Sequence, residues 1–111
     1  MLSIEIMKKY TVKYSRLAKQ DITDIYKYLF ERIDEHLAKR IVGDIRKEAG
    51  LLKTFPESGQ LMVRKDNIRY TTARKYKIIY RVRKNDDAVI ILRVFHSKRD
   101  INISDADDEI W

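Results

Sequence analysis

The chain has 111 residues, of which 44% are hydrophobic and 37% charged, and this composition indicates one globular domain over residues 1–111 rather than a disordered chain. The 24 lysines and arginines outnumber the 17 aspartates and glutamates, so the formal net charge is +7 and the expected partner is a nucleic acid, an anionic membrane or an acidic protein. Cysteine is absent, which excludes disulfides, iron–sulfur clusters and thiolate zinc sites, and the two histidines and scattered glycines predict neither a metal site nor a cofactor.

No stretch of the sequence resembles a targeting or membrane segment. The N-terminal residues lack the apolar region of a signal peptide, and no apolar run approaches the roughly 20 residues that a transmembrane helix needs. We therefore expect a cytoplasmic protein without a membrane partner. Both Met1 and Met7 remain open as the natural start.

The first half of the chain predicts one strand and two helices. Apolar and polar residues alternate over residues 9–14, which indicates a strand, and Ser15 then offers a helix N-cap. Apolar residues recur at helical spacing over residues 18–33, and after a second capping residue, Asp34, they do so again over residues 37–52. Two helices with so short a connection should pair as an antiparallel hairpin.

The second half predicts strands. Pro56 and Gly59 end the second helix, and the apolar spacing then becomes twofold over residues 68–73, 76–83 and 88–96, with residues 84–87 as a hairpin turn. The expected fold class is α+β with the order β-α-α-β-β-β, the antiparallel helical hairpin packed on one face of a mostly antiparallel sheet. The core should span residues 8–100, followed by an acidic tail over residues 101–111.

Alternation along the last two strands predicts two unlike faces of the sheet. The apolar sets expected under the helices are Tyr76, Ile78, Tyr80 and Val82 from one strand and Ile90, Leu92 and Val94 from the other. The opposite sets form an open face that carries Lys77, Arg81, Arg83 and Arg93, with Ile91 and Phe95 between them. Such a surface suits a nucleic acid or an amphipathic partner helix, and the alternative is an ordinary solvated sheet face.

The basic residues also suggest a chemistry. His96 ends the last strand beside Lys98 and Arg99, where an imidazole can act as a general acid or base or simply pack at the sheet edge. RNA cleavage without a metal needs a base, an acid and cations at the phosphate, and the candidate catalytic residues are Lys77, Arg81, His96 and Arg99. The candidates for binding nucleic acid or another target are Arg69, Arg74, Lys75, Arg83, Arg93 and Phe95. Whether the chain is an enzyme stays open.

Short motifs follow one another in a fixed order along the chain. They are Tyr14-Ser15-x-x-Ala18, Asp21-Ile22-x-x-Ile25-Tyr26-x-Tyr28, Pro56-x-x-Gly59, Arg69, Tyr76-x-Ile78-x-Tyr80-Arg81-Val82, and a last strand that ends in His96-x-x-Arg99-Asp100. From about residue 10 to residue 100 this order resembles the RelE/ParE superfamily of toxins from type II toxin–antitoxin systems. The resemblance implies a growth inhibitor that a cognate acidic antitoxin neutralises. It also implies that the complex binds operator DNA only through the antitoxin.

The superfamily divides between RelE-like toxins, which cut mRNA on the ribosome, and ParE-like toxins, which act on DNA gyrase. Lys77 stands where RelE-like toxins often have a catalytic arginine, and Arg99 matches a basic position after the last strand. Two features depart from the RelE pattern: Ile68 and Tyr70 stand where lysines are usual, and no tyrosine follows Arg99. The long helical hairpin and the ending of the last strand resemble the ParE side, so a gyrase inhibitor is the main expectation. A RelE-like mRNA endoribonuclease and an inactive or nucleic-acid-binding module of the same fold stay open as alternatives.

Charge also predicts how the antitoxin binds. An acidic amphipathic helix or strand should lie across the helical hairpin or the open face. The chain itself ends in a similar segment, because residues 105–109 are mostly acidic and Ile110 and Trp111 follow. We expect a solvated tail, and the alternative hypothesis is that this segment folds back on the basic face as an internal mimic of the antitoxin.

Overall fold

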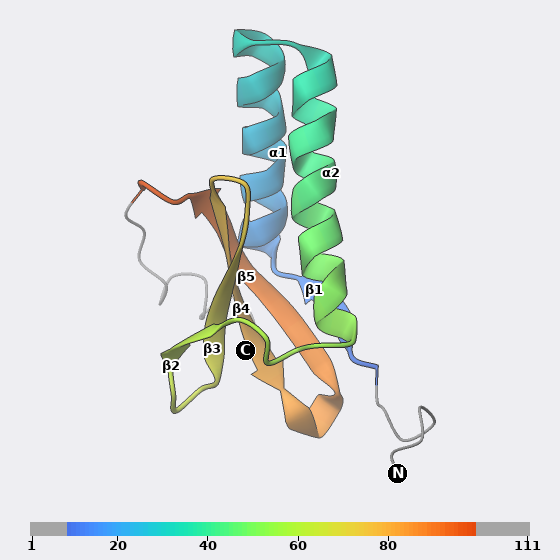
Figure 1. Ribbon diagram of the computed structural model, residues 1–111, viewed down its shortest axis with the longest axis vertical. Coiled ribbons are helices and arrows are strands. Elements are labelled where there is room, and N and C mark those ends of the chain that lie inside the picture. Colours follow the sequence, from blue (N-terminus) through green and yellow to red (C-terminus); the bar gives the residue numbers. More distant parts are fainter. Residues whose placement is uncertain (1–8, 100–111) are drawn as a thin grey trace.

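The computed structural model describes residues 9–99, which form two helices and a five-stranded sheet (Figure 1). In chain order the elements are β1 (Thr11–Tyr14), α1 (Arg16–Arg32), α2 (Glu35–Gly50), the 3-10 turn η2 (Leu51–Lys53), β2 (Gln60–Val63), β3 (Ile68–Ala73), β4 (Tyr76–Arg83), the 3-10 turn η3 (Lys84–Asp86) and β5 (Ala88–His96). The expectations for the start of the chain and for its acidic tail concern residues 1–8 and 100–111 and lie outside the described residues.

The sheet is mixed but mostly antiparallel, which confirms the expected fold class. Its strand order is β1-β5-β4-β3-β2, in which β1 and β5 run parallel and the other neighbours antiparallel. One strand was not expected: β2 has only four residues, and its pairing with β3 is irregular between Leu61 and Val63. Its sequence, Gln-Leu-Met-Val, is too short and lacks the alternation from which a strand is recognised.

Both helices begin where the sequence predicted. The side-chain oxygens of Ser15 and Asp34 accept hydrogen bonds from the backbone N–H groups of Ala18 and Leu37, at 3.0 and 2.7 Å. Figure 1 shows the helices side by side, standing on one face of the sheet and extending beyond it. No helix within residues 9–99 is long and apolar enough to cross a membrane.

The main core lies between the helices and the sheet. Its buried residues are Ala18, Ile22, Ile45, Ala49, Leu52, Ala73, Ile78, Tyr80, Val82, Val89, Ile91 and Val94. Tyr80 is fully buried, and its hydroxyl accepts a hydrogen bond from the backbone N–H of Gly59 at 2.9 Å. A Cβ on Gly59 would lie 2.5 Å from that hydroxyl, so a glycine is required where the chain passes Tyr80.

The prediction for the faces of β5 was partly wrong because the strand contains a bulge. Ile79 pairs with Arg93 but Tyr80 pairs with Ile91, so Leu92 is an extra residue on β5. The alternation is therefore interrupted within the strand. Ile91 lies in the main core instead of on the open face. Ile90 and Leu92, which we expected under the helices, belong to a second cluster with Ile68, Ile79, Ala88 and Phe95 on the opposite face. The placement of Val94 in the main core is confirmed.

Candidate functional site

Helix α1 is bonded to the second half of β5. The strand β1 pairs with β5 only as far as Tyr14 and Ile91, and the start of α1 takes its place beside the rest of β5. The Ser15 hydroxyl donates a hydrogen bond to the carbonyl oxygen of Leu92 at 2.9 Å. The Asp21 carboxylate accepts bonds from the backbone N–H of Val94 at 2.9 Å and from Nε and Nη2 of Arg93 at 2.7 and 2.9 Å.

The pairing with Asp21 changes the interpretation of Arg93. We predicted Arg93 as a target-binding cation on the open face, but its side chain and that of Asp21 are only 13% and 9% exposed. A bidentate, mostly buried pair holds its geometry strongly, so Arg93 joins helix to strand. Sequence reasoning quoted Asp21 as part of a motif but gave it no partner, because 72 residues separate it from Arg93.

A groove of about 630 Å³ opens between α1 and the end of the sheet, and we call it the end groove. Asp24 and Tyr28 line it from α1, while Tyr76, Phe95, His96 and Arg99 line it from the sheet side. Its volume lies in the range of ligand-binding clefts, and its walls combine aromatic rings with a carboxylate and cations. Three predicted residues, His96, Arg99 and Phe95, therefore meet in one place.

His96 is held in this groove by two contacts. Its ring lies edge-on to that of Tyr76, with 5.5 Å between centroids, and its Nδ1 accepts a hydrogen bond from the backbone N–H of Lys98 at 3.2 Å. An imidazole that accepts at Nδ1 carries its proton at Nε2 when neutral, so Nε2–H is the group left to bind a partner.

Two tyrosines complete the groove, and sequence reasoning missed both as site residues. Burial raises the pKa of Tyr76 above its ordinary value, and the nearby Tyr28 raises it further, so the Tyr76 hydroxyl is protonated at neutral pH. Tyr28 is 55% exposed, and the guanidinium of Arg32 lies 5.1 Å from the centre of its ring. Tyr28 and Tyr76 both occur in the motifs quoted from the sequence, and this was the sequence feature from which they could have been found.

The other two candidate catalytic residues lie elsewhere. Lys77 and Arg81 point to the face opposite the helices, whereas Tyr76, which faces His96 across the strand pair, packs against the main core. The Nζ of Lys77 lies 4.6 Å from the centre of the Tyr70 ring, and Nη2 of Arg81 lies 3.8 Å from a carboxylate oxygen of Asp66. The end groove therefore brings together two of the four candidate catalytic residues, His96 and Arg99, while Lys77 and Arg81 do not line it.

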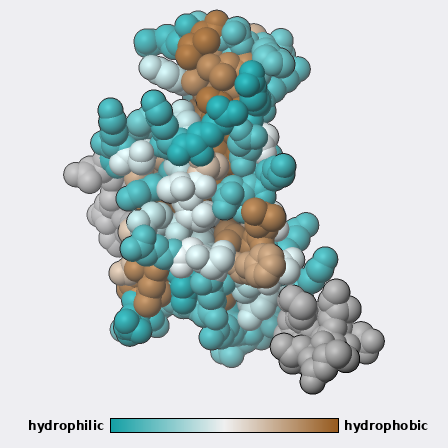
Figure 2. Space-filling model, in the orientation of Figure 1, coloured by the Kyte–Doolittle hydropathy of each residue, from teal (hydrophilic) through white to brown (hydrophobic). Residues whose placement is uncertain are grey.

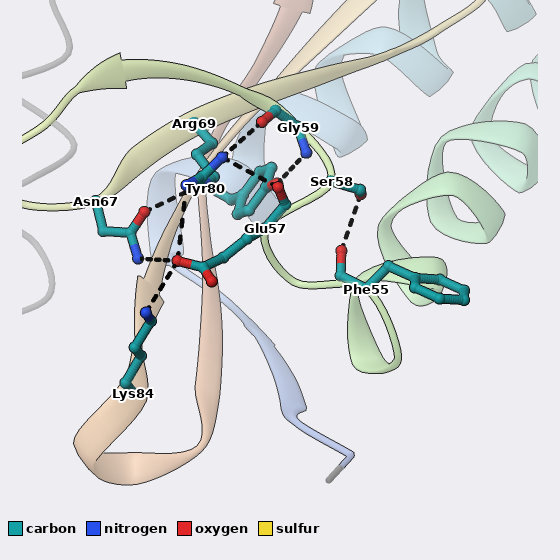
Figure 3. Close-up of polar contacts among 8 residues, drawn as sticks. All are labelled: Phe55, Glu57, Ser58, Gly59, Asn67, Arg69, Tyr80 and Lys84. Carbon is teal, nitrogen blue, oxygen red and sulfur yellow. Dashed lines mark hydrogen bonds and ion pairs between the residues drawn. The ribbon is translucent and has the colours of Figure 1, made fainter. Parts of the chain in front are cut away.

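Arg69 fastens the loop that contains Pro56-x-x-Gly59 (Figure 3). Its Nη1 donates to the carbonyl oxygens of Glu57 and Gly59 at 3.0 and 2.9 Å, and its Nε donates to Oδ1 of Asn67 at 2.9 Å. The pKa of the Glu57 carboxyl is lowered, mainly because the Asn67 amide donates a hydrogen bond to it. Lys84 and Arg69 lower this pKa further. Most donors of Arg69 are therefore committed within the fold, which favours a positioning role over target binding.

The remaining predicted binding residues lie at the turns. Arg74, at the β3–β4 turn with a φ of 56°, forms an ion pair with Asp44 of α2. The carbonyl of the neighbouring Lys75 accepts a hydrogen bond from the backbone N–H of Ser97 at 2.8 Å, which places Lys75 beside the exit from β5. Arg83 pairs with Asp86 in the β4–β5 turn. Within residues 9–99, no three His, Cys, Asp or Glu side chains gather in a way that could hold a metal ion.

Comparisons with known proteins show what the sequence and the fold of this chain are similar to. A family model described as the ParE toxin of the type II toxin–antitoxin system parDE matches residues 12–101. The fold is similar to that of a chromosomal ParDE system from P. aeruginosa, with a TM-score of 0.68 and 21% identity over 79% of this chain and 96% of the other. It is also similar to the toxin–antitoxin complex RelBE2 from Mycobacterium tuberculosis, with a TM-score of 0.64 and 25% identity over 81% and 93% of the two chains.

A more distant likeness is to a mutant of the E. coli toxin RelE in the free state, with a TM-score of 0.61 and 12% identity over 91% and 93% of the two chains. No curated protein matches the chain in sequence.

Proposed function

This chain belongs to the ParE toxin family and is the toxin of a type II toxin–antitoxin system, and from that premise we propose that it arrests growth by binding DNA gyrase. Within the superfamily that the sequence resembles, gyrase is the target of the ParE side and mRNA on the ribosome that of the RelE side. Both targets are found in the cytoplasm, so action there is part of the proposal.

The observation that carries the choice of gyrase is the separation of the basic candidates. Metal-independent RNA cleavage needs an acid, a base and phosphate-binding cations around one phosphate. Lys77 and Arg81 lie on the sheet face away from the helices, whereas His96 and Arg99 line the end groove. A toxin that binds its target does not need the two pairs together, and the aromatic, cationic end groove is then its contact surface.

The partner that a type II toxin requires is a cognate antitoxin. We propose that an acidic amphipathic segment of it covers the helical hairpin or the sheet face opposite the helices. The hairpin offers apolar surface for this, since Phe30 and Ile33 near its free end are 47% and 59% exposed. Figure 2 shows hydrophobic surface gathered at that end. We expect the toxin–antitoxin complex to bind operator DNA through the antitoxin.

Purified toxin added to a gyrase supercoiling reaction tests the proposal. We expect loss of supercoiling and accumulation of cleaved gyrase–DNA complexes, while primer extension on mRNA from an induced culture shows no new ends. The Arg99→Ala variant should lose inhibition, and Arg40→Ala, which removes an exposed arginine from α2, should keep it. Intact supercoiling together with cut mRNA would assign the chain to the RelE-like mechanism. Intact supercoiling with intact mRNA and normal growth would indicate an inactive module.

A further inference from the structure

The end groove contains two opposite charges that the fold does not use. Asp24 lies on the α1 side and Arg99 on the sheet side, and within residues 9–99 neither side chain has an ion-pair partner. One carboxylate oxygen of Asp24 accepts a single hydrogen bond, from Nε2 of Gln20 at 2.8 Å, so most of its capacity to accept is left. Uncommitted charges that converge in a concave site are typical of a place that binds a ligand.

Aromatic rings lie on both walls of the same groove. Tyr28 follows Asp24 by one helical turn, so its ring and the carboxylate are neighbours on one face of α1. Tyr76 lies on the sheet side, where the edge-on contact with His96 holds its ring. The groove therefore offers stacking surface to a flat aromatic ligand, next to a carboxylate that accepts hydrogen bonds.

The sheet side of the groove adds hydrogen-bond donors that suit an anion. The backbone N–H of Arg99 donates to the carbonyl oxygen of His96 at 2.9 Å, and this turn keeps the two residues adjacent. The guanidinium of Arg99 and the Nε2–H of His96 are both left for a partner. Guanidinium groups bind phosphate oxygens in a fork geometry, and the imidazole N–H supplies a further donor.

We propose that the end groove binds a guanine mononucleotide. The base stacks on the rings of Tyr28 and Tyr76, and its N1–H and exocyclic amino group donate to the Asp24 carboxylate. The phosphate accepts hydrogen bonds from Arg99 and His96. The groove measures about 630 Å³ and thus lies within the range of clefts that bind small molecules.

Other small ligands satisfy only part of the groove. Inorganic phosphate would use Arg99 and His96 but would leave the rings without a contact and would be repelled by Asp24. An organic cation would use Asp24 and be repelled by Arg99. An adenine nucleotide has one amino donor beside the acceptor N1, which a carboxylate repels, whereas guanine presents two donors side by side. The combination of groups therefore selects guanine with a phosphate.

This inference goes beyond the proposed function, and only one consequence rests on it. If gyrase is bound through the end groove, a guanine nucleotide competes with it, and the nucleotide concentration then sets how much toxin can reach its target. Binding of the nucleotide is measured on the purified toxin alone. Its failure and the failure of gyrase inhibition are therefore separate results.

The two histidines of the chain give the test an internal reference. His96 lines the groove, whereas His36 is exposed near the start of α2 and does not line it. In a titration with GMP at constant pH, followed by NMR of the histidine rings, we expect saturable shifts at His96 and none at His36. AMP should bind at least about tenfold more weakly, because a hydrogen bond to a charged group contributes that much. Unshifted His96 signals at millimolar GMP, or equal affinities for GMP and AMP, would overturn the proposal.

Matched variants test the assigned contacts by isothermal titration calorimetry. Asp24→Asn keeps the shape of the side chain and should lower the affinity for GMP by about tenfold or more, with loss of the preference over AMP. Arg99→Ala should weaken binding of GMP but not of guanosine, which lacks the phosphate. The control Glu31→Gln makes the same change in charge on α1 outside the groove and should have no effect.

Two results of these measurements would contradict the proposal. Affinity for GMP that survives both Asp24→Asn and Arg99→Ala would place the nucleotide on another surface. A guanine-containing oligonucleotide that binds at least about tenfold more tightly than GMP would assign the groove to a nucleic acid strand instead of a mononucleotide.

Discussion

Replacing Gly59 by alanine should destabilise the fold through steric crowding against the Tyr80 side chain and the Tyr70 backbone. A Cβ at this position would lie 2.5 Å from the Tyr80 hydroxyl, 2.6 Å from the carbonyl oxygen of Tyr70 and 2.9 Å from a ring carbon of Tyr80. Since no described glycine has a positive φ, the cost at Gly59 is crowding and not a forbidden backbone conformation. Crowding in a packed interior costs about 1–3 kcal/mol. The hydrogen bond from Gly59 to Tyr80 contributes about another 1 kcal/mol.

Gly59→Ala should therefore lower the free energy of unfolding by roughly 2–4 kcal/mol, a large part of the 5–15 kcal/mol typical of a domain. Urea denaturation followed by circular dichroism measures this. Gly43→Ala is the matched control: Gly43 lies inside α2 with nothing within 4 Å of its Cβ position, so alanine there should stabilise the protein by up to about 1 kcal/mol.

A double variant separates the contact with the Tyr80 hydroxyl from the contact with the Tyr70 carbonyl oxygen. Tyr80→Phe removes the hydroxyl but leaves the Tyr70 carbonyl, which is backbone and cannot turn aside. In the Gly59→Ala background it should therefore restore only part of the lost stability. The reasoning is refuted if Gly59→Ala unfolds at the same urea concentration as the unmodified chain, or if it behaves like Gly43→Ala.

Three further predictions concern charged side chains that are bonded within the fold. Asp21→Ala leaves the mostly buried Arg93 without its carboxylate, so the free energy of unfolding measured in urea should fall by roughly 3–5 kcal/mol. The control Asp24→Ala removes an exposed carboxylate from the same helix and should change this free energy by no more than about 0.5 kcal/mol. Equal losses in the two variants would contradict the argument. The lowered pKa of Glu57 means that its contribution to stability is complete above the ordinary carboxyl pKa and is lost as the pH falls through the lowered value. The difference in stability between the unmodified chain and Glu57→Gln should thus vanish in acid and grow toward neutral pH, and a difference constant with pH would count against it. Arg69→Lys keeps the charge but not the fork that reaches two carbonyls, so a loss of about 1–3 kcal/mol is expected, and an unchanged urea midpoint would show that the fork is dispensable.

The parts of the fold that could be predicted from the sequence depend on neighbouring residues. The caps Ser15 and Asp34 act on the N–H three residues further along, and the apolar spacing of each helix repeats within one or two turns. Features that depend on distant residues could not be predicted. The extra residue Leu92 exists only in the register between β4 and β5, and a bulge leaves no mark in local spacing.

The candidate site shows the same division. Sequence reasoning found His96, Arg99 and Phe95, because they follow one another at the end of one strand, and the structure brings them to one groove. It grouped Lys77 with His96 because both are near strand ends. The residue that packs against His96 is Tyr76, and the pleat directs its neighbour Lys77 to the opposite face of the sheet. It assigned Tyr28 and Asp24 no role, since only the packing of α1 against the end of β5 brings them there.

The way in which α1 begins has a consequence for behaviour at high concentration. Past Tyr14 the second half of β5 would be a bare strand edge, and such an edge is a template on which other chains can add. Ser15 and Asp21 bond the carbonyl of Leu92 and the N–H of Val94, so this edge has fewer free groups to offer. The two outermost strands, β1 and β2, have four residues each, and short edges make poor templates. The fold is in this way protected from edge-to-edge aggregation when the concentration of the chain rises.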